Sequence, residues 1–225
     1  DWNGNGQTTF GLFNPGRSRF FLKNSYSGGA ADISFNFGPK DSGWEPVTGD
    51  WNGNGQATAG LYNVRKSKFF MKNDLSGGDA DIAFNFGPRG KSWIPVSGDW
   101  DGDGQFDIGL YDPVKSRFFL KTSLSGGKAD DTFQFGPRNA GWLPFTGDWD
   151  GDGSSEIGLY NPRSGSFHLK YDFSGGPADE SFKYGPADSE WIPVATVIAG
   201  HRGCCGSCGY TRQGVGISLL ETCGD

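Results

Sequence analysis

A repeat of 49 residues limits what this chain can fold into more than any other feature. The acidic hexapeptide at residues 1–6 recurs at 50–55, 99–104 and 148–153, with no insertion or deletion between copies. A tryptophan keeps the same step at positions 44, 93, 142 and 191. Because repeat units bury their apolar surfaces against their neighbours, a constant step predicts that every unit meets the next in the same way.

Within each unit the hydrophobic residues alternate with a period of two, and no segment shows helical periodicity. In the third unit, Phe118 and Leu120 alternate with Phe119 and Lys121, and Gly-Gly and Gly-Pro pairs separate such runs as turns. We predict four strands per unit, near 109–111, 117–122, 131–135 and 142–147 in unit 3. Four strands in roughly 40–50 residues are typical of a propeller blade. The sequence therefore predicts an all-β fold, a four-bladed β-propeller over residues 1–198.

The two ends of the repeat array predict how the ring closes. Unit 1 begins at the acidic loop and lacks the strand that precedes this loop in the other units. The corresponding segment, residues 191–197, follows unit 4, and no acidic loop comes after it. A C-terminal strand would thus complete blade 1 and remove two exposed sheet edges. The alternative is an open array that continues into further sequence or into the next molecule.

The acidic loop carries the strongest chemical motif. In units 3 and 4 it places carboxylates at loop positions 1, 3, 5 and 9 around a glycine at position 6. Ca²⁺ takes about six to eight oxygen ligands, which such a loop supplies together with the backbone carbonyl at position 7. A solvated Asp-Gly turn is the alternative, but the full order of acids occurs twice. The predicted ligands are Asp99, Asp101, Asp103, Gln105 and Asp107 in unit 3, and Asp148, Asp150, Asp152, Ser154 and Glu156 in unit 4.

The loops of units 1 and 2 keep the spacing but lose most of the charge. Each has one carboxylate, and position 9 is Thr9 or Thr58. Calcium affinity depends largely on the number of charged ligands, so we expect weaker sites here. The predicted ligands are Asp1, Asn3, Asn5 and Gln7 in unit 1, and Asp50, Asn52, Asn54 and Gln56 in unit 2.

The loop of unit 3 and the strand after it resemble a known family. The run Gly-Asp-Trp-Asp-Gly-Asp-Gly at residues 98–104, followed by Ile-Gly-Leu-Tyr at 108–111, resembles the FG-GAP and VCBS-type calcium repeats, which include the blades of integrin α-chain propellers. The resemblance covers residues 1–198. It implies a structural calcium in a loop that links the first two strands of a blade. It also implies adhesion, scaffolding or polysaccharide contact. Integrin propellers have seven blades, so the blade number is taken from this chain's own repeat.

All the cysteines lie in the last 22 residues of the chain. Such a cluster predicts local disulfides in an oxidising compartment, with a zinc site as the alternative. The segment 205–208 is similar to the papain-family nucleophile signature, but that family needs a histidine far downstream, and His168 and His201 both come earlier. We therefore expect a Cys-rich tail at 199–225 and no enzyme. The cysteines are Cys204, Cys205, Cys208 and Cys223.

The net charge of the chain argues against some classes of binding partner. A net charge of −6 argues against nucleic acid, whose phosphates need a basic surface, and no apolar run is long enough for a membrane span. Residue 1 lies inside a motif, so the missing signal peptide is not evidence about localisation. We expect a secreted or cell-surface recognition, adhesion or scaffold module for an extracellular glycan or protein. The alternatives are a self-associating subunit of a filament or surface layer, and the propeller part of a secreted hydrolase.

Overall fold

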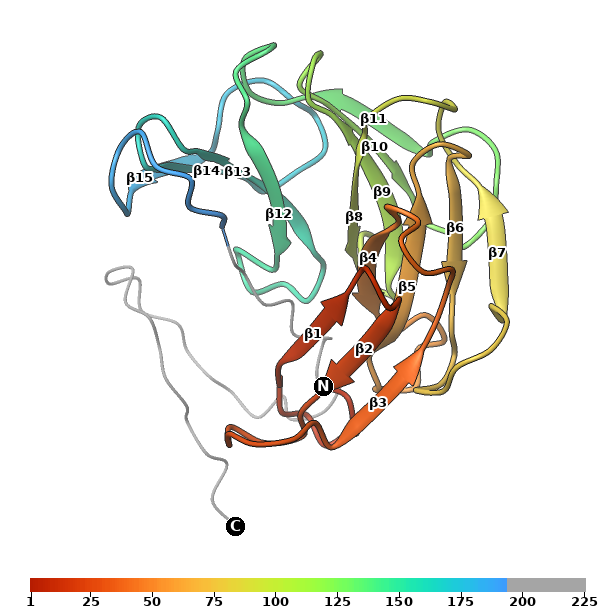
Figure 1. Cartoon of the computed structure of the whole chain (residues 1–225). Coiled ribbons are helices and arrows are strands. Elements are labelled where there is room, and N and C mark those ends of the chain that lie inside the picture. Colours follow the sequence, from red (N-terminus) through yellow and green to blue (C-terminus); the bar gives the residue numbers. More distant parts are fainter. Residues whose placement is uncertain (194–225) are drawn as a thin grey trace.

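The computed structural model describes residues 1–193 and confirms the predicted all-β class. Four antiparallel sheets follow one another in chain order as the blades of a four-bladed β-propeller (Figure 1). No described residue is helical. Blade 1 contains the three strands β1 (Gly11–Asn14), β2 (Arg19–Leu22) and β3 (Ile33–Asn36).

Blades 2, 3 and 4 each contain four strands that pair in chain order. Blade 2 consists of β4 (Glu45–Gly49), β5 (Thr58–Asn63), β6 (Lys68–Met71) and β7 (Ile82–Asn85). Blade 3 consists of β8 (Ile94–Gly98), β9 (Asp107–Asp112), β10 (Arg117–Lys121) and β11 (Asp131–Gln134). Blade 4 consists of β12 (Leu143–Gly147), β13 (Glu156–Asn161), β14 (Ser166–Lys170) and β15 (Glu180–Lys183).

Each blade is one strand out of phase with the sequence repeat. The strand before an acidic loop pairs with the strand after it, so β12 lies beside β13 with Phe145 opposite Gly158, as expected. We call β4, β8 and β12 the inner strands, because β8 contacts both of the others. The strand that follows the loop is longer than predicted: β9 begins at Asp107, because this residue pairs with Gly98.

The hydrophobic core lies between neighbouring blades. One cluster joins Trp2 and Phe20 of blade 1 to Leu61 of blade 2, and two further clusters join blades 2 and 3 and blades 3 and 4. The repeated tryptophan before each inner strand stacks flat on a ring of the blade that this strand begins, so these tryptophans have a packing role. The stacked pairs are Trp44–Phe70 at 4.6 Å, Trp93–Phe119 at 4.4 Å and Trp142–His168 at 4.3 Å.

A glycine with positive φ lets the blades approach closely at this stack. Gly136 has φ +83°, and a Cβ built there would lie 2.7 Å from Cδ1 of Leu159 in the next blade. Any larger residue would be strained in its backbone and would clash with that leucine. The position is Gly38 and Gly87 in the first two units, which meet Leu61 and Leu110 in the same way.

The expected closing strand at 191–197 lies mostly outside the described residues. Trp191, Ile192 and Pro193 are described, and they are not part of a strand. Trp191 and Ile192 are 60% and 77% exposed. The Cys-rich tail at 199–225, with its expected disulfides, lies entirely outside the described residues.

Candidate metal centre

The four acidic loops, which we number 1 to 4 after the repeat unit that each begins, share one backbone turn. The carboxylate at position 1 points back into the loop and accepts hydrogen bonds from backbone amides, which holds the turn closed. Asp99 accepts from the amide of Asp103 at 3.1 Å and from that of Gly104 at 2.9 Å. Gly104 has φ +90°, a conformation that favours glycine at this position. Asp1, Asp50 and Asp148 accept the equivalent bonds in their own loops.

Loop 4 brings four carboxylates together. Oxygen atoms of Asp148, Asp150, Asp152 and Glu156 all lie within 4.8 Å of one another. Glu156 is buried at the first position of β13, and its Oε2 accepts a hydrogen bond of 2.6 Å from the amide of Trp149. Burial and then the neighbouring aspartates raise the pKa of Glu156 to about 7. Every carboxylate predicted as a ligand in this loop therefore faces one point.

Loop 3 gathers three of its four predicted carboxylates. Oxygen atoms of Asp99, Asp101 and Asp107 lie within 4.8 Å of one another, but Asp103 is not part of this group. Oδ1 of Asp103 accepts a hydrogen bond of 2.7 Å from the amide of Gln105. Asp107 is buried at the start of β9, and burial followed by repulsion from Asp101 raises its pKa to about 8.

This set of donors fits a hard divalent cation. Burial and then repulsion between the neighbouring carboxylates raise the pKa values of Asp107 and Glu156. Carboxylate oxygens in a loop of this spacing are the ligands that Ca²⁺ prefers. An ion among them would relieve the repulsion. The residues able to hold it are the clustered carboxylates of loops 3 and 4.

Loops 1 and 2 have the turn without the cluster. Asn52 and Asn54 of loop 2 use their side-chain oxygens to accept hydrogen bonds from the amides of Asn54 and Gln56, at 3.2 and 2.9 Å. Loop 1 repeats this pattern with Asn3 and Asn5, and Oδ1 of Asn5 accepts from the amide of Gln7. These amide oxygens complete the turn, and each loop has a single carboxylate for a cation.

Position 9 also differs in loop 2. The hydroxyl of Thr58 donates 2.7 Å to the carbonyl of Lys72 and is buried in the blade.

At position 7, the amides of Gln105 and Ser154 donate to the position-5 carboxylates of Asp103 and Asp152. This hydrogen bond holds the backbone of residue 7 against the turn.

Neighbouring loops are tied to each other, which the repeat did not predict. In three of the four loops, the carbonyl of the position-1 aspartate accepts a hydrogen bond from the amide of position 8 in the next loop. These bonds run from Ala57 to Asp1 at 2.8 Å, from Phe106 to Asp50 at 2.7 Å and from Ser155 to Asp99 at 2.6 Å. Each loop is thus part of a junction between two blades.

Comparisons with known proteins leave the family open. No family model matches the chain, and no curated protein matches it. A solved structure described as a crystal structure of BBS1N in complex with ARL6DN, soaked with mercury, is similar to it with a TM-score of 0.46 and 9% identity. The match covers 82% of this chain and 55% of that chain. A likeness of this extent does not bear on function, and the propeller assignment rests on the four sheets themselves.

Among residues 1–193 no helix is long and apolar enough to cross a membrane. His168, which the repeat places in a blade, stacks on Trp142, and burial lowers its pKa. His201 and the cysteines that resemble a papain signature lie outside the described residues.

Proposed function

We propose that this chain is a calcium-stabilised β-propeller that acts outside the cell as a non-enzymatic recognition or scaffold module for a glycan or protein. The observation that carries the proposal is the set of four carboxylates in loop 4, all within 4.8 Å of one another. The cysteine cluster and the resemblance to adhesion-type calcium repeats favour the extracellular setting. The propeller itself favours a rigid surface on which loops are held in place.

Bound calcium would supply positive charge to a cluster that is otherwise repulsive. The residues of the chain determine what this charge stabilises. Asp99 sits in loop 3, and its carbonyl accepts the amide of Ser155 beside loop 4, so ordering loop 3 also orders the junction between blades 3 and 4. Glu156 and Asp107 each begin a strand, so a bound ion would fix the loop against the start of that strand. The ion is structural in this proposal.

The recognition role can be tested with the purified chain on a glycan array and on a panel of immobilised extracellular-matrix proteins. We expect saturable binding in calcium, loss of binding after chelation, and recovery when calcium is restored. The Asp150→Asn variant should need more calcium for the same binding, whereas Asn52→Ala should behave as the unchanged protein does. Release of hydrolysed product from any bound ligand would contradict the non-enzymatic role. The absence of binding to every ligand class would contradict recognition.

A further inference from the structure

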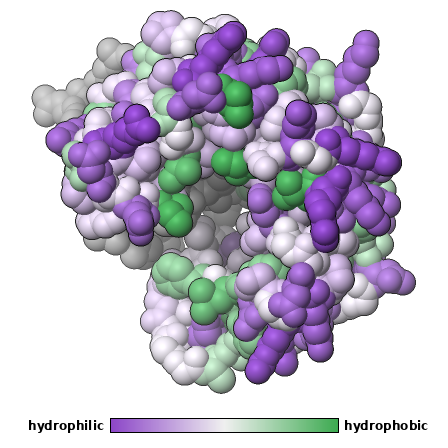
Figure 2. Space-filling view, turned by 45° about the horizontal axis from the view of Figure 1, so that its top comes forward, coloured by the Kyte–Doolittle hydropathy of each residue, from purple (hydrophilic) through white to green (hydrophobic). Residues whose placement is uncertain are grey.

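Large exposed hydrophobic side chains gather on blades 1 and 4, on either side of the junction where the ring would close. Leu12 is 75% exposed, whereas Leu61, Leu110 and Leu159 at the same repeat position are fully buried. Hydrophobic surface also surrounds the hollow between the blades in Figure 2. The exposed residues on these two blades are Phe10, Leu12, Tyr26, Phe182, Tyr184, Trp191 and Ile192.

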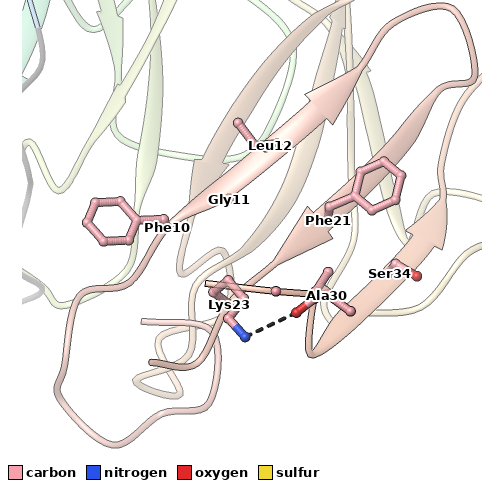
Figure 3. A pocket seen from close by; sticks show the side chains of 9 residues that line it. Phe10, Gly11, Leu12, Phe21, Lys23, Ala30 and Ser34 are labelled. Atoms are coloured by element: carbon pink, nitrogen blue, oxygen red, sulfur yellow. Dashed lines mark hydrogen bonds between the residues drawn. The ribbon is translucent and has the colours of Figure 1, made fainter. Parts of the chain in front are cut away.

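A groove of about 650 Å³ lies on one face of blade 1, across β1, β2 and β3, beside the free edge of β1 (Figure 3). Phe10 and Leu12 line it from β1 and the residue before it, and Phe21 lines it from β2. Leu12 pairs with Phe21 across the two strands, so these side chains share one face of the sheet. Lys23 closes one end, where its Nζ donates 3.1 Å to the carbonyl of Ala30.

In the other blades an inner strand and a tryptophan occupy this place. The inner strand pairs with the strand equivalent to β1, with a proline opposite the leucine: Pro46 with Leu61, Pro95 with Leu110 and Pro144 with Leu159. The tryptophan before it stacks on Phe70, Phe119 or His168, and Phe21 holds the same repeat position in blade 1. Phe21 has no tryptophan on it, and Trp191 has no ring partner among the described residues.

We propose that the chain's own segment 191–196 completes blade 1: residues 192–196 pair along the free edge of β1 as its inner strand, and Trp191 fills the groove. The segment pairs antiparallel with β1, Pro193 lies opposite Leu12 and Ala195 opposite Phe10, and Trp191 stacks on Phe21. The register is copied from the three complete blades, where the equivalent pairs are Pro95 with Leu110 and Ser97 with Ile108. This assignment stands independently of the calcium sites.

The connecting chain has the length that this docking needs. In every complete junction the inner strand begins nine residues after the outermost strand of the preceding blade ends, from 36 to 45, from 85 to 94 and from 134 to 143. The same step from the end of β15 at Lys183 reaches Ile192. The sequence Trp-Ile-Pro-Val at 191–194 repeats the one at 93–96. These matches favour the chain's own segment over that of a second copy.

A buried hydroxyl at the same edge points to the missing strand. Oγ1 of Thr9 is buried without a hydrogen-bond partner among the described residues. Its equivalent, Thr58, lies 2.7 Å from the carbonyl of Lys72 and 3.3 Å from that of Gly49, the last residue of the inner strand β4, and its hydroxyl can donate to either one. In the proposed register the carbonyl of residue 196 takes the place of Gly49. A buried hydroxyl without a partner is unfavourable, so this acceptor would stabilise the closed ring.

Cysteine cross-linking tests the register and the source of the strand. The full chain would carry serine at the four tail cysteines, together with Phe10→Cys and Ala195→Cys, which face each other in the proposed pairing. The matched control pairs Phe10→Cys with Val194→Cys, whose side chain points to the opposite face of the sheet. Under mild oxidation we expect the first pair to form an intramolecular disulfide at least ten times faster than the control.

Equal rates for the two pairs, or no cross-link in either, would overturn the proposal. A cross-link found only in dimers or larger species would also overturn it, and would assign the groove to the strand of a second copy in a filament. Hydrogen exchange on the unmodified protein gives a test that needs no variant. The amides of β1 should be protected as those of β5 are, and exchange at least a hundredfold faster than in β5 would show that the edge is free.

Discussion

Loops 1 and 2 and loops 3 and 4 build the same turn with different chemistry. In all four, the aspartate at position 1 accepts the backbone amide of the glycine at position 6. In loops 1 and 2 the side chains at positions 3 and 5 are asparagines that also bond to the backbone. In loops 3 and 4 they are aspartates, and a buried acid follows at position 9.

The comparison teaches that the turn does not need the extra charges. Asn52 and Asn54 form the turn with neutral oxygens, so the charges of Asp101 and Asp103 are not required for the turn. Burial of Asp107 and then repulsion from Asp101 raise the pKa of Asp107 to about 8. The divalent cation proposed for loops 3 and 4 would offset this repulsion.

The largest difference should appear when position 3 is removed in calcium. Asp101→Ala deletes a charged ligand, whereas Asn52→Ala deletes a neutral oxygen that bonds to the backbone. At about 10 mM calcium, roughly 10 to 100 times the dissociation constant of such extracellular modules, loss of a site costs about 1–3 kcal/mol of unfolding free energy. We expect that loss for Asp101→Ala and about 0.5 kcal/mol or less for Asn52→Ala, measured by urea denaturation. Equal losses would remove the distinction between the loops.

The pH dependence should be the next largest effect. Asp107 and Glu156 have folded pKa values of about 8 and 7, above their ordinary values of 3.8 and 4.5. The folded chain therefore holds protons that the unfolded chain releases, and in EDTA its stability should fall as pH rises from about 4 to 8. Calcium competes with these protons, so its affinity should rise over the same window.

Thermal unfolding in EDTA between about pH 5 and 8 checks this window. The variant with Asp107→Asn and Glu156→Gln should lose most of the fall in melting temperature. Loops 1 and 2 have Thr9 and Thr58 at this position and contribute no such titration. A fall of unchanged size in the variant would place its cause elsewhere in the molecule.

Adding charge to loop 2 should convert it toward loop 3. Asn52→Asp with Asn54→Asp supplies three carboxylates with Asp50 while the turn is kept. We expect calcium affinity at this loop to rise about tenfold, or about 1.4 kcal/mol, as measured by calorimetric titration. Asn54→Ala is the control and should not raise the affinity. A double variant that binds calcium no better than the unchanged loop would show that position 9 decides the site.

The smallest effect should have the opposite sign. In EDTA, Asp101→Asn removes a charge that repels Asp107, so the metal-free protein should become more stable by up to about 1 kcal/mol. The same variant should be less stable than the unchanged protein in calcium. If the variant were destabilised equally in both conditions, Asp101 would have a purely structural role.

Much of the fold could be predicted because the same strand and turn pattern occurs in all four repeat units of the sequence. Alternation at Phe118 and Leu120 placed β10, and the missing strand before Asp1 predicted that the blades are out of phase with the repeat. The position of the carboxylates at Asp148, Asp150 and Asp152 followed from loop spacing. The strands and the loop ligands depend on residues that are close together in the sequence, so a single sequence is enough to predict them.

Contacts between residues of different repeat units could not be read from the sequence in the same way. The hydrogen bond from Ser155 to the carbonyl of Asp99, and the stack of Trp142 on His168, join residues that no local pattern relates. Asp103 and Asp152 both accept the amide of residue 7, but only Asp152 lies in the carboxylate cluster of its loop. Spacing predicts which residues share a loop, and packing decides where each oxygen points.

The most direct test of the central claim is a calorimetric calcium titration of the unchanged protein beside Asp101→Asn and Asp150→Asn. If loops 3 and 4 are the calcium sites, the unchanged protein should bind two ions more tightly than any others. Each variant should lose one of these two, and the double variant should lose both. Binding that is absent from the unchanged protein, or a stoichiometry that neither variant alters, would contradict the claim.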